Sequence, residues 1–407
     1  MSQPMSGIRI LEVAEHAFVP TAGAVLSDWG ADVIKVEHAQ RGDAMRGLAK
    51  TGVVSLGDGV HVLNEHANRG KRSIGIDLSN AEGREVLYKL AARSDVFLTN
   101  KLPNVLKKLK IDIDDIRAHN PKIIYVRGTA FGPVGPDQNR GGYDMTAFWS
   151  RAGSAASATP PGLPFVVPQP GPAYGDSLGG MTIAGGIAGA LLKRERTGEA
   201  SVVDVSLLGT GTWAMGAGIA LGLQSGEPWS MAAAARGGGP SNPLTGIYKT
   251  SDDRFVSLVM LQAFKYWPDF CAHIDKPELA ADERFDSPEK LSDNAAEART
   301  IVAEVIEGST LAEWTERFST LQGQWAPVQN SLEVAADPQV RANGYVVRTA
   351  TQEGVEFELV SSPVQFDEKP TATHRAPEFN EHGDSLLQEL GFEWERILEL
   401  KAAGAIT

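Results

Sequence analysis

Short apolar runs alternate with longer amphipathic stretches over the first 130 residues of this 407-residue chain. Apolar runs separated by helical stretches of about ten to fifteen residues predict parallel strands in a doubly wound α/β sheet. Ligands of such sheets bind at the carboxyl ends of the strands. We expect strands at 8–13, 32–37, 73–77, 95–99 and 123–127, and helices at 20–29 and 81–93.

The pattern changes after residue 150. Residues 160–172 contain six prolines and two glycines, which predict an extended loop. A stretch of small and apolar residues at 177–196, closed by Gly198, predicts a long helix. Residues 201–208 form an apolar strand or helix.

A second unit follows a segment rich in Gly, Ala, Ser and Pro at 222–243, which indicates a domain boundary or a loop. A strand is expected at 255–260, and residues 264–318 are mostly helical and acidic in pattern. Short strands return at 345–347 and 357–360. Two helices, at 384–390 and 394–401, end the chain.

Composition adds limits on partners and location. The chain is 42% hydrophobic and 22% charged, as is typical of soluble globular proteins, and its net charge of −13 argues against nucleic acid and anionic membranes. A single cysteine, Cys271, excludes an intrachain disulfide and fits the cytoplasm. Neither a secretory signal nor a membrane-spanning stretch is evident, so we expect a cytoplasmic protein.

The chain lacks the common metal-binding and serine-nucleophile motifs. The eight histidines form no H-E-x-x-H pair, so no metal site is predicted, and no G-x-S-x-G motif occurs. Basic and amide residues lie at several predicted strand ends and loops. They form either a solvated face or a phosphate cradle: Asn68, Arg69, Gly70, Lys71, Arg72, Asn100, Lys101, Lys107 and Lys108.

Asp176 is the strongest candidate for a catalytic residue. It begins the predicted long helix, and helix N-termini stabilise negative charge. One interpretation is a plain N-cap, a position that Asp commonly occupies. The other is a nucleophile, because Gly175, Gly179 and Gly180 leave room for a substrate.

Several motifs together resemble family III CoA-transferases. They are G-I-R-I-L-E-V at 7–13, L-S-D-W-G-A-D-V-I-K-V-E at 26–37, N-R-G-K-R-S-I at 68–74, G-Y-D at 142–144, G-D at 175–176 and L-Q-E-L-G at 387–391. The resemblance implies a large Rossmann-like CoA-binding domain built from residues 1–224 and 330–407. It also implies a smaller inserted α+β domain, residues 225–329, and an interlocked homodimer.

The resemblance further implies a reaction. Asp176 matches the nucleophilic aspartate of the family, which attacks an acyl-CoA and forms an aspartyl anhydride and then an aspartyl-CoA thioester. A carboxylic acid accepts the CoA, and coenzyme A enters only as the substrate thioester. Asp144 is a second carboxylate beside the site. The glycine loop Gly237, Gly238 and Gly239 resembles a lid over the intermediate.

Tyr143 separates two branches of the family. Racemases of 2-methylacyl-CoA carry a histidine at this position, and a phenol is a poor base near neutral pH. Transferase activity is therefore favoured. A racemase or epimerase, and a CoA-binding protein without turnover, remain the alternatives. The CoA contacts implied by the resemblance are His16, Ala17, Phe18, His38, Ile76, Asn100, Lys101, Val105 and Lys108.

Overall fold

The computed structural model describes residues 3–48, 59–230 and 242–407. The predicted glycine loop, Gly237 to Gly239, lies outside these residues. Two compact units divide the chain. The larger contains the chain up to Thr159, Leu163–Ser225 and Pro338–Thr407, and the smaller contains Pro160–Gly162 and Gly226–Asp337. The predicted domain boundaries and the interlocked dimer remain predictions.

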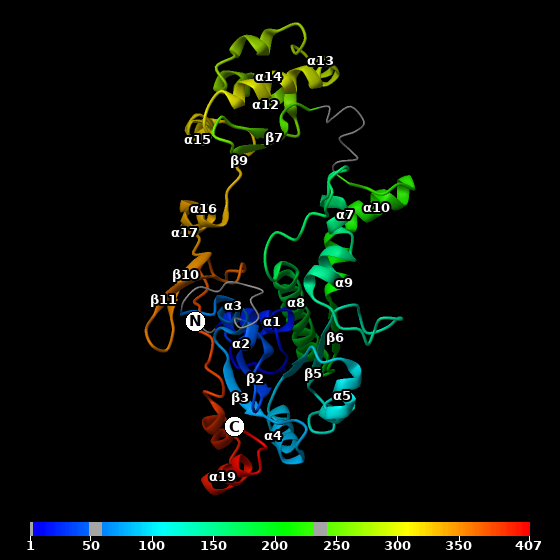
Figure 1. Ribbon diagram of the computed structural model, residues 1–407, viewed down its shortest axis with the longest axis vertical. Helices are drawn as coiled ribbons and strands as arrows, with labels where there is room; N and C mark the ends of the chain where they lie inside the picture. Colours follow the sequence, from blue (N-terminus) through cyan, green and yellow to red (C-terminus); the bar gives the residue numbers. More distant parts are fainter. Residues whose placement is uncertain (1–2, 49–58, 231–241) are drawn as a thin grey trace. The chain divides into compact units, whose positions relative to one another are not determined.

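A six-stranded parallel sheet forms the centre of the larger unit (Figure 1). Its strand order is β3-β2-β1-β4-β5-β6. The strands β1 to β3 are added toward one edge of the sheet and β4 to β6 toward the other, as in doubly wound sheets. The expected parallel α/β sheet is confirmed, and each predicted strand lies within two residues of an observed one. The strands are β1 (Arg9–Val13), β2 (Asp32–His38), β3 (Arg72–Ile76), β4 (Val96–Thr99), β5 (Ile124–Thr129) and β6 (Val202–Ser206).

Helices cover both faces of this sheet because successive strand residues point to opposite sides. In β1, Ile10 packs toward α1 (Phe18–Asp28) and α8 (Tyr174–Thr197), which lie side by side. Leu11 packs into the second core, with α4 (Ala81–Ala92), α18 (Gly383–Glu389) and α19 (Trp394–Ala402). Helices from both ends of the chain therefore complete one sandwich.

The remaining elements of the larger unit are short. They are α2 (Ala44–Gly47), α3 (Val62–Asn68), α5 (Pro103–Leu109), α6 (Ile113–Arg117), the helical turn η2 (Met145–Ser150), α7 (Ser154–Ala158), α9 (Leu207–Ala214), α10 (Gly216–Ser225), α17 (Pro338–Ala342) and the antiparallel pair β10 (Val346–Ala350) and β11 (Glu356–Val360). The stretch at 201–208 thus contains both alternatives, since β6 runs directly into α9.

The smaller unit packs helices against a three-stranded antiparallel sheet, around a core that includes the buried Cys271. Burial raises the pKa of its thiol to about 12, as expected for a structural cysteine. The elements are β7 (Thr245–Lys249), β8 (Phe255–Val259), β9 (Trp325–Pro327), α12 (Ala263–His273), η4 (Pro277–Ala281), α13 (Pro288–Asp293), α14 (Ala295–Glu307), α15 (Leu311–Arg317), η5 (Phe318–Thr320) and α16 (Ser331–Ala336).

Candidate active site

Two adjoining cavities open at the carboxyl edge of the parallel sheet. The larger has a volume of about 680 Å³ and the smaller about 290 Å³. Glu15, Arg41, Lys101 and Val105 line both, so the two form one continuous site along the strand ends. This is the edge at which doubly wound sheets bind ligands.

Most of the predicted site residues gather in these cavities. Ala17 and Asp144 are buried, at 5% and 7% exposure, directly beside the lining residues. The larger cavity is lined by His16, Phe18, Asn100, Lys101, Val105, Tyr143 and Asp176, and the smaller by His38, Ile76, Lys101, Val105 and Lys108.

The loop after β1 is held in an unusual backbone conformation. His16 has a φ of 67°, in the left-handed region that non-glycine residues rarely adopt. Asp43 Oδ1 accepts a hydrogen bond from the His16 N–H at 3.0 Å, and another from the Met45 N–H at 2.8 Å. Glu15 and Asn100 exchange two further hydrogen bonds. These contacts fix the direction in which the loop faces the cavity.

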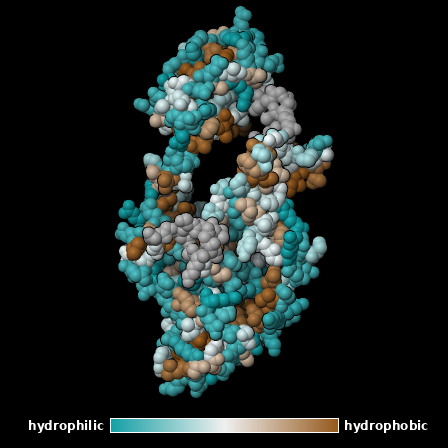
Figure 2. All heavy atoms as spheres, in the orientation of Figure 1, coloured by the Kyte–Doolittle hydropathy of each residue, from teal (hydrophilic) through white to brown (hydrophobic). Residues whose placement is uncertain are grey.

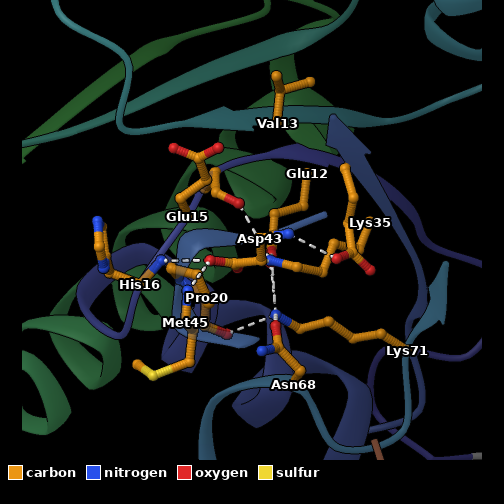
Figure 3. Close-up of polar contacts among 12 residues, drawn as sticks. Glu12, Val13, Glu15, His16, Pro20, Lys35, Asp43, Met45, Asn68 and Lys71 are labelled. Carbon is orange, nitrogen blue, oxygen red and sulfur yellow. Dashed lines mark hydrogen bonds and ion pairs between the residues drawn. The ribbon is translucent and has the colours of Figure 1, made fainter. Parts of the chain in front are cut away.

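A buried ionic network anchors this loop to the sheet (Figure 3). Lys35 Nζ lies 2.7 Å from Asp43 Oδ2 and 3.1 Å from Glu12 Oε1. Lys71 Nζ donates to both oxygens of Glu12, at 2.9 and 2.8 Å, and to Asn68 Oδ1 at 3.1 Å. The paired charges cancel one another, so burial of the network is compatible with a stable fold.

For two members of the basic cluster, the buried ion pairs correct both interpretations. Lys71 is buried against Glu12, and Arg69 is buried against Asp28 at 2.7 Å. Neither side chain forms a solvated face or a phosphate cradle. Lys101 and Lys108, in contrast, do line the cavities. Inward pairing could not be read from the sequence, because the acidic partners lie far away along the chain.

Asp176 lies inside the first turn of α8. The N-cap is Ala173, with a φ of 55°, and no side chain caps this helix end, so the plain N-cap interpretation of Asp176 is wrong. The carboxylate is half-buried, and among the described residues no cation pairs with it. Burial, and secondarily the charge of Asp144, raise the pKa of Asp176 to about 7.

The glycines of α8 have specific steric roles at this end. A Cβ at Gly175 would lie 2.6 Å from the Phe148 ring, and one at Gly179 would lie 2.3 Å from the Phe18 ring. The absence of side chains therefore brings η2 and the start of α1 against the turn that carries Asp176. The expectation that these glycines leave room for a substrate is wrong, because protein side chains fill the space beside them.

Two aromatic rings form part of the wall of the larger cavity. The His16 and Tyr143 rings meet edge to face at a centroid distance of 5.5 Å. Tyr143 is 62% exposed, so its hydroxyl is open to the cavity and to solvent. The predicted carboxylate Asp144 follows it and turns inward.

Further cavity residues were not predicted. Arg41 comes three residues after the end of β2, so the strand-end rule points to it. Arg140 and Phe131 lie in the connection after β5, a stretch without a clear hydrophobic pattern. In the described part of the chain, no cluster of three or more His, Cys, Asp or Glu residues is arranged to hold a metal ion. Within the same residues, every helix is too short or too polar to cross a membrane.

The chain is similar to known proteins over most of its length. Residues 5–383 match the family described as CoA-transferase family III. The chain is 30% identical to the cinnamoyl-CoA:phenyllactate CoA-transferase of Clostridium sporogenes, over 97% of this chain and 95% of that one. It is also 30% identical to the succinate–glutarate CoA-transferase of Agrobacterium fabrum, over 95% and 96%. A crystal structure of a CAIB/BAIF family protein from Brucella suis superposes with a TM-score of 0.78 at 28% identity, covering 96% and 100%.

Proposed function

The chain belongs to CoA-transferase family III, and on this premise we propose that it transfers CoA from an acyl-CoA thioester to a free carboxylic acid through Asp176. The observation that carries the proposal is the environment of that carboxylate. It lines a 680 Å³ cavity at the carboxyl edge of the sheet, and among the described residues it has no cationic partner. An unpaired carboxylate in a cavity is free to attack.

The proposed reaction exchanges bonds of similar energy. An Asp176 oxygen attacks the thioester carbonyl, CoA thiolate leaves, and an acyl-aspartyl anhydride forms. The thiolate then attacks the aspartyl carbonyl, which releases the first acid and leaves an aspartyl-CoA thioester. The acceptor carboxylate displaces the thiolate to give a second anhydride. Attack of the thiolate on the acceptor carbonyl releases the new acyl-CoA and restores Asp176.

The raised pKa supports this role. A carboxylate whose conjugate acid has a pKa of about 7 is a stronger nucleophile than an ordinary aspartate and is still substantially ionised near neutral pH. The first backbone N–H groups of α8 lie at the same end of the helix as Asp176. They can stabilise the oxyanion that develops during attack.

The two adjoining cavities support binding of an extended thioester. The smaller cavity places Lys101, Lys108 and Arg41 around a space with apolar walls, including Ile76 and Val105. We assign it to the nucleotide end of CoA, whose phosphates require cations. The larger cavity then receives the pantetheine arm and the acyl group beside Asp176.

Intact-mass analysis tests the proposal. We expect incubation with an acyl-CoA to add a covalent mass to the wild-type chain and none to Asp176→Asn, with CoA affinity nearly unchanged because Asn keeps the size of the side chain. Asp253→Asn, which alters an 85% exposed carboxylate of the smaller unit, should behave like the wild type. Turnover by Asp176→Asn at the wild-type rate would reject the proposal.

One observation keeps epimerisation as a second candidate. His16 lies next to Tyr143 in the same cavity, and its imidazole could remove the proton that the phenol cannot. Exchange of the C2 hydrogen of a 2-methylacyl-CoA in deuterium oxide would favour this activity. Transfer of CoA without exchange supports the transferase.

We also propose that two copies of the chain associate. In α9 and α10 the Trp213 side chain is 86% exposed and Leu223 is 82% exposed, and no residue of α10 is buried. Figure 2 shows hydrophobic surface at α10. An apolar helix of this kind is typical of an interface.

A further inference from the structure

The second carboxylate of the site is held in an unusual way. Asp144 is buried, and its Oδ1 accepts a hydrogen bond from the Met145 N–H at 2.8 Å. Its Oδ2 accepts from Gln169 Nε2 at 2.9 Å. Among the described residues, no ion pair involves Asp144. Its charge is therefore stabilised by N–H donors, one of them a side chain of the proline-rich loop.

The orientation of the Gln169 amide is defined by its contacts. Nε2 also donates to the Gly171 carbonyl at 3.0 Å, so two acceptors identify the nitrogen end. The oxygen end, Oε1, is buried and has no hydrogen-bond partner in the described part of the chain. A buried unpaired carbonyl costs free energy, which is characteristic of positions retained for function.

The same loop is tied to the turn that carries the nucleophile. Trp149 Nε1 donates to the Val167 carbonyl at 2.8 Å. The Tyr174 ring packs edge to face against Phe148 and Trp149, at 6.2 and 6.4 Å. Tyr174 begins α8, two residues before Asp176. The loop, η2 and the start of α8 thus form one packed cluster.

We infer that Gln169 is a positioning residue, whose amide holds the Asp144 carboxylate in place beside the turn that carries Asp176. This inference rests on the proposed function of Asp176. The charge of Asp144 is, after burial, the second cause of the raised pKa of Asp176. Other titratable or charged groups line the same cavity or contact the start of α8. Among the described residues they form no ion pair with Asp144 or Asp176: Glu15, His16, Arg41, His66, Lys101, Arg140, Tyr143 and Tyr174.

Two variants remove the contact while keeping the loop. Gln169→Met matches the length of the side chain without its donor, and Gln169→Asn keeps an amide that is one methylene too short. Val166→Ala, at a 62% exposed position of the same loop, is the matched control. Infrared difference spectra between each protein and its Asp176→Asn counterpart report the protonation of Asp176 without turnover.

We expect the Asp176 titration midpoint to fall by roughly one pH unit in both Gln169 variants, because the neighbouring charge is less well held. The control should keep the wild-type midpoint near 7. Single-turnover formation of the covalent adduct at pH 8.5 should slow by roughly 10- to 100-fold, the range caused by misplacement of about 1 Å. A merely structural role of Gln169 would lower stability without moving the midpoint.

Unchanged midpoints in both Gln169 variants would overturn the inference. Failure of the proposed function looks different, because the wild-type protein would then form no adduct. The infrared titration would still decide the role of Gln169 in that case, since it requires only the carboxylate.

Discussion

At the scale of single residues, Asp176 experiences opposing influences. The N-terminus of α8 favours the ionised carboxylate, whereas burial and the charge of Asp144 favour the protonated form. Because the pKa is raised to about 7, burial and the charge of Asp144 outweigh the effect of the helix N-terminus. A site that destabilises its own charge in this way is typical of catalytic groups.

This conflict predicts a dependence of stability on pH. The pKa of Asp176 is higher in the native protein than in the unfolded chain, so the native state binds more protons between about pH 4 and pH 7. Native stability is therefore lost as the pH rises through this window. Asp176→Asn should be more stable than the wild type at pH 8 by roughly 2 kcal/mol, given about 1.4 kcal/mol per pKa unit and partial exposure of the group.

Urea unfolding of both proteins at pH 8 and pH 4 provides the measurement. The advantage of the variant should disappear at pH 4, where the wild-type carboxyl is neutral. Equal urea midpoints at pH 8 would show that Asp176 is not destabilised in the native protein.

The sequence predicted Asp176 and much of the cavity wall, but not the backbone conformation and loop contacts that hold Asp176 and Asp144 in place. The glycines and the family motif pointed to Asp176. The left-handed conformation of Ala173, which moves Asp176 from the cap into the first turn, has no signal in the sequence because alanine rarely adopts it. The contact between Gln169 and Asp144 depends on how a proline-rich loop folds back, which no periodicity describes.

At the scale of elements, close packing of α8 against α1 sets the shape of the cavity. Gly179→Ala should force the Phe18 ring to move, because the new Cβ would lie 2.3 Å from it. We expect a loss of about 1–3 kcal/mol in the free energy of unfolding, as for other overpacked sites. Acyl-CoA turnover should fall as well, because Phe18 lines the cavity.

Gly185 on the same helix is the matched control. A Cβ at this position meets no atom within 4 Å. Gly185→Ala should stabilise the protein by about 0.5–1 kcal/mol through helix propensity alone. If chemical denaturation shows similar changes for the two variants, tight packing at Gly179 is not what shapes this end of α8.

The regular elements were predictable because their patterns are local. Buried strands of the parallel sheet appear as apolar runs, and α4, α8 and α19 appear as helical stretches of sufficient length. The strands β7 and β9 were missed. β9 is only three residues long, and β7 contains Gly246, Tyr248 and Lys249 in no clear alternation.

At the scale of the whole molecule, the exposed apolar residues of α9 and α10 predict a homodimer. Light scattering should give about twice the chain mass of 43.4 kDa for the wild type. Trp213→Glu should shift the population toward the monomer, because an 86% exposed indole would be exchanged for a charge within the proposed interface. Trp394→Glu, at a 47% exposed position on α19, is the control and should leave the mass unchanged. A monomeric wild type would contradict the prediction.

The division into two units could be anticipated from composition, but the contribution of both chain ends to one unit could not. The C-terminal helices α18 and α19 complete the core beneath β3 and β1. Contacts between segments so far apart in the sequence cannot be read from hydrophobic periodicity. The contribution of both chain ends entered the prediction only through resemblance to the family.

In the proposed reaction an oxygen of Asp176 takes part in covalent exchange, and isotope transfer to this residue would reveal the exchange. The enzyme would turn over an acyl-CoA with an acceptor acid labelled with ¹⁸O in its carboxylate, and the peptide that contains Asp176 would then be analysed by mass spectrometry. The proposed sequence leaves one acceptor oxygen on Asp176 in each cycle, so the label should appear on this residue. Continued CoA transfer with no ¹⁸O on Asp176 would show that the reaction does not pass through this carboxylate.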